Sequence, residues 1–448
     1  MNDIALTGLA RELALRADEG RPVRIGVIGS GEMGTDLVTQ AMLMKGVSVC
    51  AISTRRPHTA RQAIRIAYGD EAMAREADTA SGVTAAIEDG RIAVTSTECL
   101  VTSPLIDVVI DATGKPGVAA DYDLMAMEHG KHVVMMNVEA DVTIGPWLKK
   151  EADRLGVVYS VGAGDEPSSC MELIEFATAL GYRIVAAGKG KNNPLNHEAV
   201  PDDYVEEATR RNMNPRMLVE FVDGSKTMVE MAAIANATGL VPDLPGMHGP
   251  RADRDSLASV LIPKADGGIL SRKGVVDYTI GKGVAPGVFV IVEATHPRIV
   301  ERMDDLHVGK GPYYAFFRPY HLTSLEVPLT AARIMLYGKP DMVPLPRPVA
   351  EVCAVAKRDL AAGEPLDAIG ETCYRSFTMT VADARASRAV PVGLLEGGKV
   401  LAPVRKGELL TTANAAPDPT TRLYALRRKQ DEMLWGGAPA SEFVRDEL

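Results

Sequence analysis

The chain has 448 residues, of which 46% are hydrophobic and 24% are charged, and its formal net charge at pH 7 is −10. This composition is ordinary for a globular protein of about two to four domains, and the negative charge argues against nonspecific nucleic-acid binding. The five cysteines have no paired spacing, so they argue against a disulfide framework and a zinc motif and favour a reducing cytoplasm.

The first 20 residues carry charges throughout and have no continuous apolar stretch. This pattern predicts a short amphipathic helix rather than a secretory signal. No later segment offers the roughly 18 uninterrupted apolar residues that cross a bilayer. We therefore expect a soluble, cytoplasmic protein with no membrane partner.

A glycine-rich stretch, VRIGVIGSGEMG, follows at Val23–Gly34. An apolar run leads into G-x-G-x-x-G spacing and then into helical apolar recurrence, which predicts a strand, a tight turn and a helix. In such a turn Gly29 lets the chain reverse, Gly31 leaves room for a pyrophosphate, and Gly34 lets the helix pack closely on the strand. The N–H groups of the helix N-terminus favour phosphates. The stretch therefore predicts a dinucleotide site formed by Gly29, Ser30, Gly31, Glu32, Met33 and Gly34. A purely structural turn is the alternative.

Strands and helices alternate along the next part of the chain. Strands are predicted at Val47–Ser53, Asp107–Thr113, His132–Asn137 and Val157–Gly162, and helices at Pro57–Ala67, near Val118–His129 and near Trp147–Leu155. This alternation predicts an α/β Rossmann fold with a doubly wound parallel sheet in residues 1–162. Ligands of this architecture bind beyond the carboxyl ends of the strands, so the residues that follow each strand are the candidates.

The second strand ends in Ser53, Thr54, Arg55 and Arg56. A cofactor with a free ribose 2′-hydroxyl usually meets a carboxylate here, whereas a 2′-phosphate needs hydroxyls and a cation. The two guanidiniums favour NADPH over NADH, and a solvated basic loop is the alternative. Small and polar residues after the next two strands are expected to contact the same cofactor, although each group alone fits a structural turn: Ala112, Thr113, Gly114, Asn137 and Glu139.

Two stretches qualify as the reacting centre. In GAGDEPSS, Asp165 and Glu166 follow a strand as candidate catalytic acids, while Ser168 and Ser169 open a helix (Ser168–Leu180) and could bind an anion. An ordinary helix N-cap with acidic residues in favourable dipole positions is the alternative.

The second stretch, GKGKNNP, follows the predicted strand Arg183–Gly188. If extended, Lys189 and Lys191 share one face and can neutralise a phosphate or a developing oxyanion. A solvated basic loop is the alternative. Two amides beside the lysines and three polar residues farther along the chain are further substrate-binding candidates: Asn192, Asn193, Lys226, Arg318 and His321. For Arg318 and His321, a role in packing is an equal alternative.

The rest of the chain predicts two further domains. Residues 163–345 are expected to form an α+β catalytic, substrate and dimerisation domain, and a proline-punctuated linker at Val343–Val352 precedes short β-like pieces. Residues 346–448 are therefore expected to form a small β-rich domain.

Several of these motifs resemble a known superfamily. The segments VIGSGEMG, DVVIDATG, HVVMMNVEAD and GKGKNNP resemble, in order and position, the cofactor and active-site segments of the homoserine dehydrogenase superfamily. The C-terminal segments AKRDLAAGEPL and PVRKGELLTTANA resemble a SAF domain, a small β-clip module. A homoserine dehydrogenase-like oxidoreductase with a trailing SAF domain is similar to the 1-deoxy-D-xylulose 5-phosphate reductoisomerase-like enzymes.

The resemblance implies NADPH-dependent conversion of 1-deoxy-D-xylulose 5-phosphate to 2-C-methyl-D-erythritol 4-phosphate, in the methylerythritol phosphate pathway of isoprenoid precursor synthesis. It implies at least a homodimer and a small phosphorylated substrate. Its phosphate would contact Ser168, Ser169, Asn192 and Asn193, while Lys189 or Lys191 neutralises the enolate or alkoxide. Glu139 stands where homoserine dehydrogenases have Lys. The adjacent Asp165 and Glu166 differ from the Asp-x-Glu metal motif of ordinary reductoisomerases, so metal ligands are not assigned and a divalent metal stays an open question.

Two other functions are compatible with the sequence. One is a reductase of the same superfamily that acts on another small aldehyde, a sugar acid or a semialdehyde. The other is a non-catalytic NADP-binding sensor that uses the C-terminal domain as an interaction module.

Overall fold

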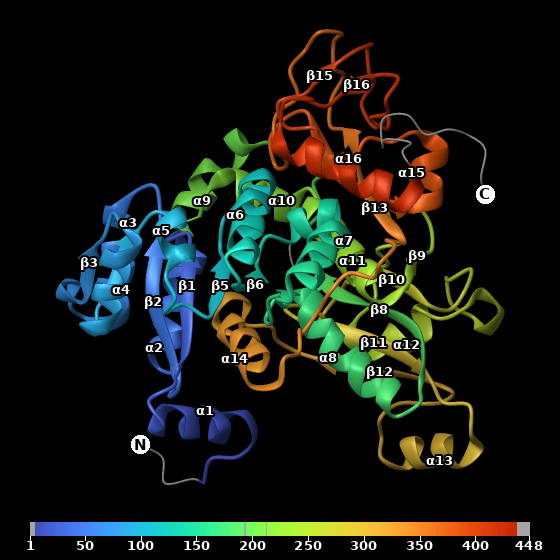
Figure 1. Cartoon of the computed structure of the whole chain (residues 1–448). Helices are drawn as coiled ribbons and strands as arrows, with labels where there is room; N and C mark the ends of the chain where they lie inside the picture. Colours follow the sequence, from blue (N-terminus) through green and yellow to red (C-terminus); the bar gives the residue numbers. More distant parts are fainter. Residues whose placement is uncertain (1–4, 192–193, 212, 437–448) are drawn as a thin grey trace. The chain divides into compact units, whose positions relative to one another are not determined.

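The computed structural model describes residues 5–191, 194–211 and 213–436 (Figure 1). Asn192 and Asn193, both predicted to bind substrate, lie outside the described residues. The chain forms two compact units, each built from several segments. Unit 1 comprises Met1–Asp141, Leu148–Ser168 and Leu322–Val343, and unit 2 comprises Val142–Trp147, Ser169–His321 and Pro344–Leu448.

Unit 1 contains a seven-stranded sheet in which every strand pair is parallel. This confirms the predicted Rossmann-type α/β fold. The strands, in spatial order, are β3 (Ala74–Glu76), β4 (Ile92–Thr95), β2 (Val47–Ser53), β1 (Val23–Ile28), β5 (Val108–Asp111), β6 (His132–Met135) and β7 (Tyr159–Val161).

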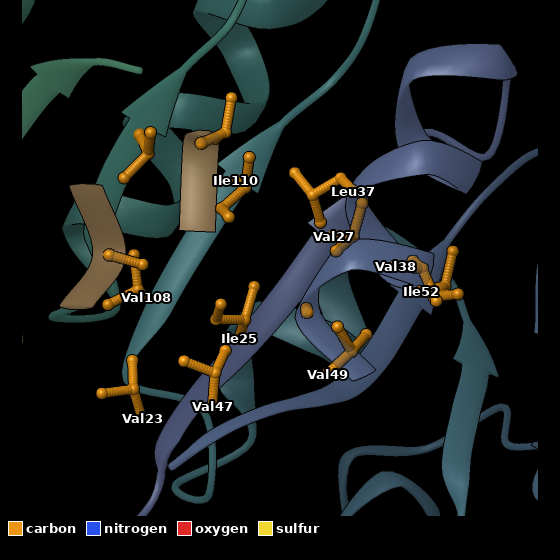
Figure 2. Packing of buried hydrophobic residues seen from close by; sticks show 14 of the residues in the cluster. Val23, Ile25, Val27, Leu37, Val38, Val47, Val49, Ile52, Val108 and Ile110 are labelled. Carbon is orange, nitrogen blue, oxygen red and sulfur yellow. The ribbon is translucent and has the colours of Figure 1, made fainter. Parts of the chain in front are cut away.

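Helices cover both faces of this sheet. Ile25 and Val27 of β1 lie in the core cluster that Figure 2 shows, together with residues of α2, α3 and α14. On the opposite face of β1, a Cβ added to Gly26 would lie 2.6 Å from Leu100 of α5. Because both faces are buried, the strands are almost continuously apolar. The helices of unit 1 are α1 (Gly8–Asp18), α2 (Glu32–Met42), α3 (Pro57–Tyr68), α4 (Ala80–Glu88), α5 (Thr97–Thr102), α6 (Pro116–Glu128) and α14 (Val327–Tyr337).

The last of these helices, α14, returns to unit 1 after more than 150 residues of unit 2. Val327, Ala331 and Ile334 are buried in the same core cluster as β1 and β2. The short turn before α14 is fixed to the end of the parallel sheet, because Thr323 N–H donates to Gly164 O at 2.8 Å. The sequence did not predict this return.

Two further regions differ from the predicted elements. The region from β3 to α5 was not assigned in advance. The helix expected near Trp147–Leu155 is α7 (Val138–Leu155), which begins nine residues earlier because the Asn137 side chain caps it, accepting from Ala140 N–H at 3.2 Å. Gly145 and Pro146 hid its first half, because both residues normally argue against a helix interior.

Unit 2 contains a five-stranded sheet of mixed direction. In spatial order its strands are β12 (Tyr313–Arg318), β11 (Val288–Glu293), β8 (Arg183–Lys191), β10 (Val275–Ile280) and β9 (Val241–Pro242). Strand β8 runs to Lys191, so the predicted end of this strand at Gly188 is wrong. Extended backbone does place the two lysines on one face, as expected.

Helices α8 (Glu166–Ala179), α9 (Val205–Arg210), α10 (Pro215–Val222), α11 (Ser225–Thr238), α12 (Leu257–Val260) and α13 (Pro297–Asp305) complete this part of the chain. The C-terminal region adds β13 (Ala350–Ala356), β14 (Tyr374–Thr380), α15 (Val381–Ser387), β15 (Lys399–Val400), β16 (Ala415–Ala416) and α16 (Arg422–Trp435), with β13 and β14 paired antiparallel. Its assignment as a SAF domain stays a prediction. No helix in the described ranges has both the length and the apolar character that crossing a membrane requires.

Candidate functional site

The glycine turn between β1 and α2 has the geometry that a dinucleotide needs. Gly29 has φ +106°, and a Cβ there would lie 2.8 Å from Ala112 O. A Cβ at Gly34 would lie 2.3 Å from Gly29 O, so close helix packing requires glycine. At Gly31, by contrast, an added Cβ would have nothing within 4 Å. Gly31 therefore opens on free space at the N-terminus of α2, as expected for a position that a pyrophosphate approaches.

The end of β2 adjoins this turn through hydroxyl groups. Ser30 Oγ lies 2.5 Å from Thr59 Oγ1, and Thr59 Oγ1 donates to Arg56 O at 2.8 Å. Thr54 Oγ1 accepts from Arg56 N–H at 3.2 Å. Thr59 was not singled out in the sequence, because only the folded loop places it beside Ser30. Ser53 is buried and bonded to Thr97 Oγ1 at 2.7 Å, so its hydroxyl has a structural role.

Arg55 and Arg56 extend from this hydroxyl cluster. Both side chains are exposed, and neither has a hydrogen bond or ion pair with any described residue. An exposed guanidinium without a carboxylate nearby retains its capacity to bind an anion bidentately. The β2 end therefore combines cations and hydroxyls, which is the chemistry of a phosphate site.

The ends of β5 and β6 are joined by a network around Thr113. Asp111 Oδ1 accepts from Thr113 N–H at 2.8 Å, and Asn137 Nδ2 donates to Thr113 O at 3.0 Å. Asn137 is thus a positioning residue for the Thr113 peptide as well as the cap of α7. Glu139 lies in the first turn of α7 rather than in a loop. Ala112 contacts the glycine turn through its carbonyl, while Gly114 is exposed at the sheet edge.

A cluster of buried acids lies beneath this network. Asp111 and Asp123 are fully buried, and neither Oδ2 of Asp111 nor either oxygen of Asp123 has a hydrogen-bond partner among the described residues. Burial raises the pKa of Asp111 to about 6, and burial followed by the charge of Asp111 raises the pKa of Asp123. Asp141 nearby accepts from Tyr159 Oη at 2.8 Å, and burial raises its pKa to about 6.

Replacing Asp123 by Asn is expected to stabilise the protein increasingly as the pH rises. The pKa of Asp123 in the folded protein is raised well above its ordinary value of 3.8. The stability that Asp123 contributes is therefore fully present below pH 3.8 and is lost as the pH rises through the folded-state pKa. The Asn amide cannot ionise, so it lacks this pH-dependent loss. The free energy of unfolding of Asp123→Asn relative to wild type should rise by about 1.4 kcal/mol per pH unit over this range.

Urea denaturation at several pH values measures this difference. The control is Asp121→Asn, because Asp121 is exposed two residues away on the same helix. A pH-independent difference for Asp123→Asn would contradict the assignment of a protonated buried carboxyl.

The first predicted reacting stretch is mostly buried. Asp165 is half-buried and Glu166 is buried at the start of α8. Ser168 Oγ donates to Gly162 O at 2.7 Å, and Ser169 is fully buried with no partner for its hydroxyl among the described residues. Ser168 is therefore engaged in fixing the chain after β7, which leaves Asp165 as the residue of this stretch with the greatest access to solvent.

The second predicted stretch provides two buried lysines on β8. Lys189 is 5% exposed and forms an ion pair with Glu230 of α11, which is 1% exposed. Lys191 is also 5% exposed, and its Nζ donates to Phe221 O at the end of α10. The alternative of a solvated basic loop is therefore wrong. The intervening glycines have a packing role, because a Cβ at Gly188 would lie 1.6 Å from Asp277 O and one at Gly190 would lie 2.0 Å from Val284 O.

The remaining predicted substrate residues lie in unit 2. Lys226 is half-buried in the first turn of α11. Arg318 forms an ion pair with Glu172 at 3.1 Å and its guanidinium lies over the Tyr320 ring at 4.8 Å, so packing accounts for its position. His321 is half-buried and directly precedes Leu322, where the chain enters unit 1.

Several polar groups of unit 2 were missed in the sequence. His248 Nε2 lies 2.8 Å from Asp243 Oδ2, and the N–H groups of His248 and Gly249 donate to buried Asp277, whose pKa burial raises to about 6. Glu230 and Arg375, described below, were also missed. None of these residues belongs to a local motif, and each gains its partner only through the tertiary fold.

Comparison with known families identifies two consecutive regions. Residues 25–160 match the family described as homoserine dehydrogenase, NAD binding domain, and residues 164–327 match the family described as oxidoreductase DRL, catalytic domain. The chain therefore has a nicotinamide-dinucleotide-binding domain and the catalytic domain of an oxidoreductase. No curated protein matches the chain.

Solved structures of low identity are also similar to this chain. One is a probable dehydrogenase from Thermotoga maritima, with 16% identity, 71% of this chain and 90% of that chain covered, and a TM-score of 0.40. Another is scyllo-inositol dehydrogenase from Lactobacillus casei with bound NAD(H) and scyllo-inositol, with 16% identity, coverage of 61% and 74%, and a TM-score of 0.35. A third is DOX-P reductoisomerase in complex with magnesium, with 11% identity, coverage of 71% and 70%, and a TM-score of 0.37.

Proposed function

We propose, from the premise that this chain is an oxidoreductase with an NAD-binding domain of the homoserine dehydrogenase type and a catalytic domain of the DRL type, that it is an NADPH-dependent reductoisomerase. Its substrate is 1-deoxy-D-xylulose 5-phosphate and its product 2-C-methyl-D-erythritol 4-phosphate, a precursor of isoprenoids.

The choice of NADPH rests on the end of β2. Two exposed guanidiniums, Arg55 and Arg56, adjoin the hydroxyls of Thr54 and Thr59. A 2′-phosphate gains charge-assisted hydrogen bonds from such groups, whereas a 2′-hydroxyl would need a carboxylate acceptor that this turn lacks. This assignment depends on one observation: neither guanidinium has a hydrogen bond or ion pair with a described residue.

The reaction breaks one C–C bond of the ketose phosphate and forms another, giving a branched aldehyde, which is then reduced to an alcohol. NADPH, when bound, supplies the hydride for that reduction. The rearrangement develops negative charge on oxygen, and a buried cation stabilises such charge strongly because little water screens it. We assign this role to Lys189, whose ammonium is held in place by Glu230.

Whether the reaction needs a divalent metal is a separate question. Asp165 and Glu166 supply carboxylate oxygens directly after β7, and hard divalent cations prefer such ligands. We therefore include activity with and without added magnesium or manganese in the test.

The proposal is tested by NADPH oxidation with a panel of substrates. The panel contains 1-deoxy-D-xylulose 5-phosphate, the same ketose without its phosphate, aspartate semialdehyde and a small sugar acid. Of these four compounds, we expect only the phosphorylated ketose to support NADPH oxidation. Mass spectrometry should identify the branched polyol phosphate as its product.

Other outcomes favour the other two functions. Oxidation of NADPH with a semialdehyde or a sugar acid, but not with the ketose phosphate, would identify a different reductase of the same superfamily. Tight NADPH binding without oxidation by any compound, in the presence or absence of metal, would favour a non-catalytic sensor.

A further inference from the structure

A group of basic side chains converges in unit 2 where β8, α10, α11 and β14 meet. Lys191 at the end of β8 donates to Phe221 O in the last turn of α10. Asn196 N–H donates to the next carbonyl, Val222 O, at 2.9 Å, and this places the adjacent His197 at the same helix end. Strand β14 is fixed to the first residue of α11, because Ser376 N–H donates to Ser225 Oγ at 2.9 Å.

Arg375 of β14 belongs to this group through its charge. Desolvation lowers the pKa of the exposed His197, and the positive charges of Arg375 and Lys191 lower it further. Desolvation also lowers the pKa of Arg375, while the charges of Asp223 and Tyr278 oppose that effect. His197, Arg375 and Lys191 therefore lie within electrostatic reach of one another.

Asp223, the carboxylate whose charge acts on Arg375, is already paired with another cation. Asp223 is fully buried and forms an ion pair with Lys357 at 2.7 Å, and its Oδ1 accepts from Ser225 N–H at 2.8 Å. Lys357 is itself bonded to Ala199 O and Glu371 O at 2.8 Å each. The Asp223 carboxylate thus has a dedicated cation and does not pair with Arg375.

The Arg375 guanidinium has no hydrogen bond or ion pair with any described residue, and it lies over the Phe377 ring at 5.8 Å from the ring centroid. A partly buried guanidinium without an acceptor carries an uncompensated desolvation cost. Glu198, which also acts on His197, is exposed and already pairs with Lys406. Among the described residues, no carboxylate therefore forms an ion pair with the Arg375 guanidinium.

We propose that Arg375, with His197 and Lys191 beside it, binds the phosphate group of the substrate. The guanidinium fork matches two phosphate oxygens, and the imidazole adds an N–H donor. This inference rests on the proposed function for the identity of the phosphate monoester. It moves the phosphate contact from the predicted Ser168, which is engaged with Gly162 O, to residues that the sequence did not single out.

The test measures the binding of inorganic phosphate to the full chain by calorimetry and the KM for the phosphorylated ketose. Arg375→Met is expected to weaken both by about 10- to 100-fold, as for the loss of charge-assisted hydrogen bonds, while NADPH affinity stays unchanged. Arg375→Lys keeps the positive charge but loses the bidentate geometry of the guanidinium. Its phosphate affinity and its KM for the ketose should therefore lie between those of wild type and those of Arg375→Met. The control is Arg405→Met, because Arg405 is exposed in the same unit.

Failure of this site and failure of the proposed function are distinguishable. Phosphate binding is measured without NADPH or turnover, so loss of binding in Arg375→Met supports the site even if the ketose phosphate is not a substrate. Undetectable phosphate binding by wild type, or equal phosphate binding by wild type and Arg375→Met, would overturn the site even if turnover is normal. If Arg375→Met does not fold, Arg375→Lys and His197→Gln provide the same comparison.

Discussion

Replacing Lys189 by Met is expected to reduce kcat strongly and to destabilise the protein by about 3–5 kcal/mol. The stability loss arises because Glu230, 1% exposed, would keep a buried charge without its ion-pair partner. The loss of turnover has a different cause, because Lys189 is the cation that we assign to the developing oxyanion. Removing such a group lowers kcat by roughly 100- to 1,000-fold.

A second variant separates these two effects. Lys189→Met combined with Glu230→Gln removes both charges, so the free energy of unfolding should recover substantially while kcat stays low. Denaturant unfolding and steady-state kinetics of the single and double variants measure the two quantities. If the double variant regains turnover together with stability, Lys189 serves the fold alone and has no part in the reaction.

Replacing both Arg55 and Arg56 by Ala is expected to raise KM for NADPH by roughly 100-fold and to leave KM for NADH almost unchanged. The guanidiniums are exposed and have no hydrogen bond or ion pair with any described residue, so their removal costs the fold little. Their effect should therefore appear in the cofactor that carries the 2′-phosphate.

The control for this variant is Arg65→Ala, because Arg65 is an exposed arginine on α3, close in sequence to the pair. It should leave the KM values for both cofactors near those of wild type. A rise in salt concentration should weaken NADPH binding more in wild type than in the double variant. Equal losses for NADPH and NADH in the double variant would contradict the 2′-phosphate assignment.

The cofactor end of the protein was largely predictable because its signals are local. Strand β2 was predicted with its observed bounds, and Gly29 and Gly34 have the turn and packing roles that their spacing indicated, while the pyrophosphate contact of Gly31 stays a prediction. A short turn places these residues by backbone geometry, and distant parts of the chain contribute little to it. Thr59 was missed because its bond to Ser30 crosses two segments.

For the lysines proposed to act on the substrate, the sequence drew attention to the residues but did not predict their surroundings. Lys189 and Lys191 were singled out, yet their burial and their partners depend on α10 and α11, which come later in the chain. Arg375 carried no signal at all, since an isolated arginine in a strand is ordinary until the fold brings its charge within electrostatic reach of His197.

The sequence by itself determined the parallel α/β sheet, the dinucleotide turn and the cationic end of β2, because periodicity, glycine spacing and residue charge act over a few neighbouring positions. Only the tertiary structure decided which charges are neutralised. Glu230 pairs with Lys189 and Lys357 with Asp223, while Arg375 pairs with no described residue. Such pairing depends on distances between segments that the order of residues in the chain does not fix. Because burial removes water from these charges, the presence or absence of a partner changes the free energy of the folded state strongly.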